Sequence, residues 1–199
     1  MKKMEVQNHL NMRFGLKVEF NRGICMSSLM DVKTAAQYNK WANNRIYNSL
    51  KQLSDEERKK DRKAFFKSIH NTLNHILLAD LLYRQRIEKK PITFKALDEI
   101  IHSEFVELEK HHRKNDIWYE NYCSQLTPVD LKEEFPFEAV GLSEREFFSL
   151  SLGTCLTNLF QHQIHHRGQI HHMISHASMD PPPVDVVKFA RGDKDKWTV

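Results

Sequence analysis

Apolar side chains recur at spacings of three and four residues along four long stretches of this sequence. Such spacing places them on one face of an α-helix, and that face must be buried against other helices. The stretches cover residues 31–53, 68–89, 96–126 and 143–177. Between the last two, Pro136 interrupts a weakly alternating segment that is predicted to be a loop or a short hairpin. The pattern therefore predicts an all-α protein, a four-helix bundle with one long crossover loop.

Local signals predict where these helices begin and end. Asp31 has the character of an N-cap, and Ser54 opens a capping box that starts a short, highly charged helix. A second capping box at Ser143 is predicted to open the fourth long helix. Pro91 follows the second helix, and the three prolines at 181–183 end the fourth, because proline cannot continue a helix.

The N-terminal stretch differs from the rest of the chain. We predict a loose N-terminal extension over residues 1–29, one helical domain over residues 30–190 and a C-terminal tail over residues 191–199. An upstream start codon read into the protein would produce such an extension. Val18 and Phe20 alternate with charged residues, so a genuine first strand or helix remains an alternative.

Composition argues against several classes of protein. The 30 Lys and Arg are interleaved with 26 Asp and Glu, which is typical of a solvated surface and not of a nucleic-acid-binding face. Three widely spaced cysteines without a C-x-x-C pair argue against a disulfide framework and favour a reducing compartment. No apolar run reaches the roughly 20 residues that cross a bilayer. We expect a cytoplasmic protein that binds neither nucleic acid nor membranes.

Histidine is the unusual component of this chain. There are 12 histidines, and six of them cluster in the fourth helix between His162 and His176. His162 and His166 stand one helical turn apart on the apolar face that also carries Leu159 and Ile170. Two imidazoles at this spacing can bind a single metal ion, as they do in H-E-x-x-H helices.

Two ligands seldom bind an ion tightly, so a third is expected from a facing helix. His75 lies on an apolar side of the second helix, whereas His70 lies on the opposite side. Taken alone, His75 is better explained as a hydrogen-bonded core histidine than as a metal ligand. Burying the pair His162 and His166 without compensation would cost several kcal/mol, which favours a metal. The remaining histidines of the fourth helix, His165, His171, His172 and His176, are expected at the surface or at the rim.

The segments around these histidines resemble the DinB family, damage-inducible four-helix-bundle metalloproteins related to the YfiT-like proteins. The resemblance extends over about residues 30–189. Its anchors are the segments 38–43, 61–69, 72–80, 162–170 and 182–185. Tyr83 and Arg84 depart from the family pattern, because many relatives carry a Trp in this region, so we expect the wall of the site to differ.

The resemblance implies that His75, His162 and His166 are the metal ligands and that the protein is a homodimer. Characterised relatives include thiol-dependent S-transferases and isomerases, which activate a low-molecular-weight thiol at the metal. Three neutral imidazoles leave a divalent ion doubly charged and open to a further ligand, which lowers the pKa of bound water or thiol. We therefore expect a metal-dependent thiol S-transferase or hydrolase acting on a small molecule.

Several points stay open at this stage. A metal-binding stress-response protein without turnover and a bundle whose histidines merely pack are the alternatives. Imidazole suits Zn, Ni, Fe and Cu, and Mn is a further candidate, so the ion is not identified. No catalytic base is named: Asp80 is expected in a salt bridge or at the surface, and Arg167 is expected to pair with a carboxylate on another helix. Gln169 lies near the ligand face and is expected to contact a ligand.

Overall fold

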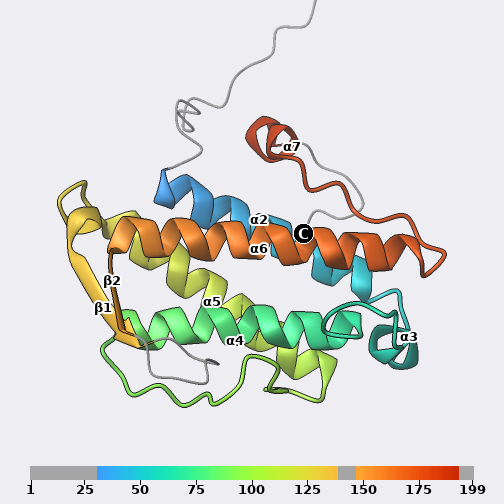
Figure 1. Cartoon of the computed structure of the whole chain (residues 1–199). Helices are drawn as coiled ribbons and strands as arrows, with labels where there is room; N and C mark the ends of the chain where they lie inside the picture. Colours follow the sequence, from blue (N-terminus) through green and yellow to red (C-terminus); the bar gives the residue numbers. More distant parts are fainter. Residues whose placement is uncertain (1–30, 139–146, 193–199) are drawn as a thin grey trace, which may run out of the picture.

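The computed structural model describes residues 31–138 and 147–192, and four long helices form its body (Figure 1). These are α2 (Val32–Leu50), α4 (Ile69–Ile87), α5 (Phe105–Gln125) and α6 (Leu152–Ser175). Both α2 and α4 pack against α5 and α6, so α2 and α4 occupy opposite corners of the bundle. The prediction of an all-α four-helix bundle is confirmed. The proposed N-terminal extension and most of the C-terminal tail lie outside the described residues.

Shorter elements complete the fold. Ser54 caps α3 (Asp55–Lys59) by accepting a hydrogen bond from the backbone N–H of Glu57, as the capping box predicts. Strands β1 (Glu134–Glu138) and β2 (Phe147–Ser151) form an antiparallel pair in the connection between α5 and α6. A 3₁₀ turn at Asp130–Lys132 precedes β1. No helix among the described residues has the length and apolar character needed to span a membrane.

The predicted start of the third helix at residue 96 is wrong, since α5 begins only at Phe105. The segment before it is held in an irregular path by side chains of α4. Asn74 Oδ1 accepts hydrogen bonds from the backbone N–H groups of Ile101 at 2.8 Å and His102 at 2.9 Å. These backbone donors are therefore satisfied by a distant side chain and need no helix of their own.

The predicted start of the fourth helix at Ser143 is also wrong. Ser143 lies outside the described residues, but residues 147–151 form β2, and α6 begins at Leu152 with Ser151 as its N-cap. Ser151 accepts a hydrogen bond from the backbone N–H of Thr154 at 3.2 Å. Phe147 and its neighbours pair with β1, so residues 147–151 form a strand. The apolar residues before residue 152 therefore do not belong to a helix, although their spacing suggested one.

A sixth helix, α7 (Val186–Arg191), was not predicted, and Figure 1 shows it lying over α2 and α6. The Tyr38 hydroxyl donates a hydrogen bond to the backbone oxygen of Val184 at 2.8 Å. The ring of Phe189 lies 5.8 Å from that of Tyr38 and 5.6 Å from that of Trp41, measured between centroids. These contacts attach the chain after α6 to the outer side of α2.

The interior of the bundle contains two apolar clusters and a polar centre. Arg167 is only 3% exposed, and its guanidinium donates to the side-chain oxygens of Asn39 and Asn43 on α2. Both asparagine amides in turn donate to Asp116 Oδ1 on α5, Asn43 at 2.9 Å and Asn39 at 3.2 Å. These hydrogen bonds, made through Nη1 of Arg167 and Oδ1 of Asp116, stabilise the buried charge and join α2, α5 and α6.

The buried His112 makes stability depend on pH. Its Nε2–H donates to the backbone oxygen of Leu73 at 3.0 Å, and burial lowers the pKa of His112 from its ordinary 6.5 to about 3. Below pH 6.5 the unfolded chain therefore binds a proton that the folded protein excludes, and the free energy of unfolding falls as the pH drops.

We expect metal-free His112→Gln, which keeps an N–H donor, to lose less stability between pH 7 and pH 4 than the wild type in urea unfolding. Parallel losses in the two proteins would contradict this assignment.

Candidate metal centre

Three histidines from two helices meet in the space between α4 and α6. Each of His75, His162 and His166 offers a ring nitrogen, and these three atoms all lie within 4.8 Å of one another. The Nε2 atoms of His75 and His162 are 3.0 Å apart. His75 is 6% exposed and His166 is 7% exposed, so the cluster stands at the edge of the core. The structure thus brings together the three residues that the sequence singled out.

Hydrogen bonds orient two of the three rings. His75 Nδ1–H donates to the backbone oxygen of Leu97 at 2.7 Å, and His166 Nδ1–H donates to Gln169 Oε1 at 2.8 Å. A carbonyl oxygen can only accept, so the proton of His75 is assigned to Nδ1 and its Nε2 carries a lone pair. This arrangement is the usual way in which proteins fix the tautomer of a metal-binding histidine. The expected contact of Gln169 with a metal-binding residue is therefore present, and that residue is His166.

Burial keeps the three imidazoles neutral. Burial, together with smaller contributions from the neighbouring His166 and His75, lowers the pKa of His162 to about 3. Burial likewise lowers the pKa of His166 to about 4, and that of His75 below its ordinary value. Neutral imidazole is the form that binds a metal ion, so no proton has to be displaced at neutral pH.

The donor set fits a divalent ion. With His75 and His166 protonated on Nδ1, both keep an Nε2 lone pair for a metal ion, and that of His75 lies 3.0 Å from Nε2 of His162. His162 Nδ1 is buried and has no hydrogen-bond partner among the described residues. Three neutral imidazoles with ring nitrogens this close together can hold one cation, and Zn, Ni, Fe and Mn all accept such ligands.

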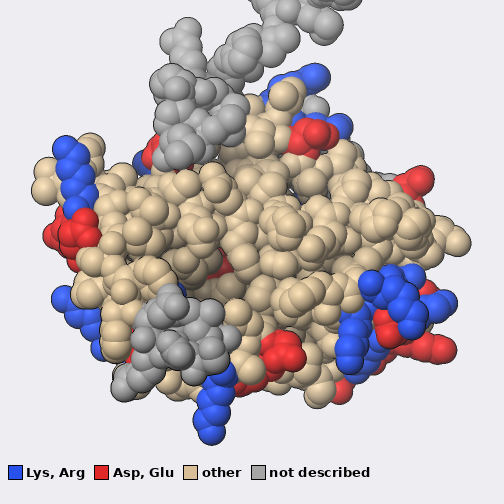
Figure 2. Space-filling model, viewed as in Figure 1, with Lys and Arg blue, Asp and Glu red and all other residues tan. Residues whose placement is uncertain are grey.

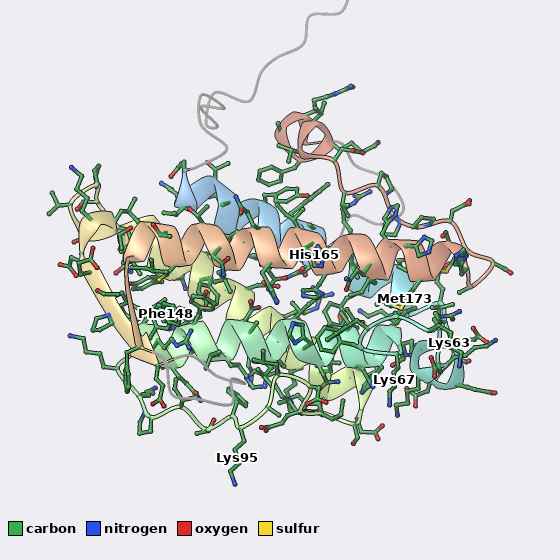
Figure 3. All side chains as sticks on the ribbon, in the orientation of Figure 1. Lys63, Lys67, Lys95, Phe148, His165 and Met173 are labelled. Atoms are coloured by element: carbon green, nitrogen blue, oxygen red, sulfur yellow. The ribbon has the colours of Figure 1, made fainter. Side chains whose placement is uncertain are left out.

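The histidines open into a cavity of about 590 Å³ between α6 and the loops before α4 and α5. The ring of Phe66 stacks on His75 with centroids 3.9 Å apart, and Phe65 is 86% exposed beside it. Leu97, Asp98 and His165 complete the nearby wall. Figure 3 shows His165 on α6, at the level of the bundle's middle. The centre is therefore a half-open site with one aromatic wall.

Some features of this wall were not predicted. Phe65 and Phe66 belong to a turn whose shape depends on left-handed backbone at Lys63 (φ 58°) and Lys67 (φ 67°). Lysine rarely adopts this conformation, so neither residue type predicts the turn from the sequence. Leu97 contributes only a backbone oxygen, which leaves no trace in a residue pattern. The Phe-Phe pair before α4 was the one available signal in the sequence.

Two predictions about neighbouring residues are wrong. Asp80 is 2% exposed and accepts a hydrogen bond from the Gln163 side chain, so it does not lie at the surface, and no salt bridge joins it to another described residue. Burial raises the pKa of the Asp80 carboxyl well above its ordinary value. Arg167 bonds to the amide oxygens of Asn39 and Asn43 and contacts no carboxylate directly among the described residues. In both cases an amide side chain intervenes between the charged groups.

His70 and the two departing positions, Tyr83 and Arg84, lie apart from the cluster. His70 Nε2–H donates to the backbone oxygen of His102 at 2.9 Å, which is the role of a core histidine. The Tyr83 hydroxyl accepts a hydrogen bond from Asn158 at 2.8 Å, and Arg84 pairs with Glu88. Neither Tyr83 nor Arg84 lines the cavity around the three histidines, so the expected change of its wall at these positions is not found.

Comparison with known proteins places this geometry in context. The model of the DinB family matches residues 26–197. Protein DinB of Bacillus subtilis (strain 168) is 26% identical over 152 residues, which cover 75% of this chain and 87% of that protein. The crystal structure of a DinB-like protein from Bacillus cereus ATCC 10987 superimposes with a TM-score of 0.54 at 20% identity, covering 76% of this chain and 95% of that one. The structural match supports the fold alone.

Alanine substitutions on α6 test the centre directly. We expect His162→Ala to abolish stoichiometric binding of Zn²⁺ in a competition titration against a chromophoric chelator, because two imidazoles seldom hold the ion. His171→Ala, on the same helix but outside the cluster, is the matched control and should bind as the wild type does. Gln169→Ala should weaken binding by about 10- to 100-fold, since it removes the group that orients His166. Equal affinity in His162→Ala and wild type would rule out the assigned ligands.

Proposed function

The chain belongs to the DinB family, and we propose that it binds a divalent metal ion through His75, His162 and His166 and uses it in thiol transfer or hydrolysis. The observation that supports this proposal is the convergence of three neutral imidazoles at the base of a cavity of about 590 Å³. Histidines that only pack the core would be enclosed by other side chains, whereas these three face a cavity that a small molecule can enter.

The proposed chemistry follows from the charge of the site. An ion held by three neutral ligands keeps its full positive charge, and when bound it stabilises the anion of a thiol or a water molecule near neutral pH. Leu97 and Gln169 hold two of the rings in place, so the donor atoms are organised before the ion arrives. Asp98 and His165, which line the same cavity, are proposed to accept the proton that the bound thiol or water loses.

A metal-binding stress-response protein without turnover is the alternative. The three histidines support both functions equally, so activity alone separates them. The ion itself, the small-thiol partner, damage inducibility and the homodimer stay predictions.

Elemental analysis of protein purified without a histidine tag, combined with a substrate screen, tests the proposal. We expect about one Zn, Ni, Fe or Mn per chain, and a lower melting temperature after treatment with a chelator, because an ion that binds only the folded state stabilises it. The metal-loaded protein should accelerate the conjugation of small thiols to electrophiles or the hydrolysis of amides, and His162→Ala should not. If the purified protein contains no metal and the chelator does not change its melting temperature, the metal site is refuted. Full metal occupancy without turnover of thiols, electrophiles or amides would leave the binding function and refute the enzyme.

A further inference from the structure

The metal cavity continues along α6 into a second cavity of about 550 Å³. Phe65, His165 and Gln169 line both cavities, so the two adjoin one another. The second cavity extends towards the C-terminal end of α6, where His172 and His176 line it. Together they form one continuous cleft with the three-histidine centre at one end.

The far end of this cleft is rich in groups that bind anions. Arg62, Lys63, His172 and His176 contribute to its lining, and no Asp or Glu is among the described residues that do so. The Lys63 side chain is 91% exposed, and its Nζ lies 3.8 Å from Asp61, at the outer limit of an ion pair. Imidazole N–H groups donate hydrogen bonds to anions in either charge state.

Arg62 also lines the far end of the cleft, but an ion pair neutralises its charge. Its guanidinium is paired with Glu57 at 2.7 Å, and its Nε is buried without a hydrogen-bond partner among the described residues. Lys63 is therefore the cation that a ligand can reach. Figure 2 shows that charged side chains gather at the edges of this face and leave its middle nearly free of charge.

The turn that carries Lys63 and Phe65 has a fixed shape. The backbone N–H of Arg62 donates to the oxygen of Lys67 at 2.7 Å, and the N–H of Lys67 donates to the oxygen of Ala64 at 2.8 Å. Left-handed backbone at Lys63 and Lys67 costs energy for a side chain with a Cβ, and such strain is concentrated at functional sites. The closed turn places the exposed Phe65 between the two cavities.

We propose that the cleft selects thiols that carry a distant carboxylate. The sulfur would bind at the three-histidine centre, and the carboxylate would lie at Lys63, His172 and His176. From His166 to His172 or His176 the helix rises roughly 9–15 Å at 1.5 Å per residue. The γ-glutamyl carboxylate of glutathione is about eight bonds from its sulfur and reaches about 9 Å at the extension of a polypeptide chain, so a thiol of this kind spans the shorter of these distances. This inference rests on the proposed function and adds the substrate class to it.

Thiol binding to the Co²⁺-loaded protein provides the test, because a thiolate ligand to Co²⁺ gives a strong charge-transfer band. The probes are glutathione, its diethyl ester, 3-mercaptopropionate and the methyl ester of 3-mercaptopropionate. We expect glutathione to bind about fivefold more tightly than its diester, the size of one partly exposed charged contact. For 3-mercaptopropionate, which is too short to reach Lys63, acid and ester should bind alike.

Two lysine variants assign the effect to the cleft. Lys63→Met should bring the preference for glutathione over its diester close to one, whereas Lys95→Met should retain the preference of the wild type. Figure 3 places Lys63 beside Met173 at one end of α6 and Lys95 far from both. Equal binding of glutathione and diester by the wild type, or an unchanged preference in Lys63→Met, would overturn the inference and leave the proposed function intact. No charge-transfer band with any thiol would overturn thiol binding at the metal itself.

Discussion

The hydrogen bonds of one buried guanidinium fix how the helices face one another. Arg167 lies in the core on α6, and the amide oxygens of Asn39 and Asn43 on α2 accept its N–H groups. The same amides donate to Asp116 on α5, whose pKa is raised by burial to about 7. A rotation of α6 would leave a buried charge without partners, which costs far more than the loss of an apolar contact.

This constraint extends to the metal centre through the next turn of the same helix. Gln163 accepts a hydrogen bond from Arg167 at 3.4 Å and donates one to Asp80 on α4. His162 and His166 immediately precede Gln163 and Arg167 in the sequence, so the polar network sets the direction in which both rings point. Since Asp80 lies on the same helix as His75, the network also sets α6 relative to the third ligand.

Much of the fold could be predicted because helical periodicity depends on residues three and four apart. The ends of α2 and α4 match the predicted caps and periodicity to within a few residues. The starts of α5 and α6 were wrong for a different reason. There, the side chain of Asn74 and the strand pairing at residues 147–151 satisfy backbone groups that a helix would otherwise satisfy. Such partners lie far along the chain and leave no periodic signal.

For the candidate site, the sequence by itself determined which side chains have the right chemistry and which helix face carries them. His162 and His166 share a face because of their spacing, and that relation holds wherever the helix lies. Only the tertiary structure decided that His75, 87 residues before His162, meets them, and that Leu97, 22 residues after His75, orients its ring. Spacing along a helix is a local property of the chain, whereas contacts between helices depend on how the whole core packs and satisfies its buried polar groups.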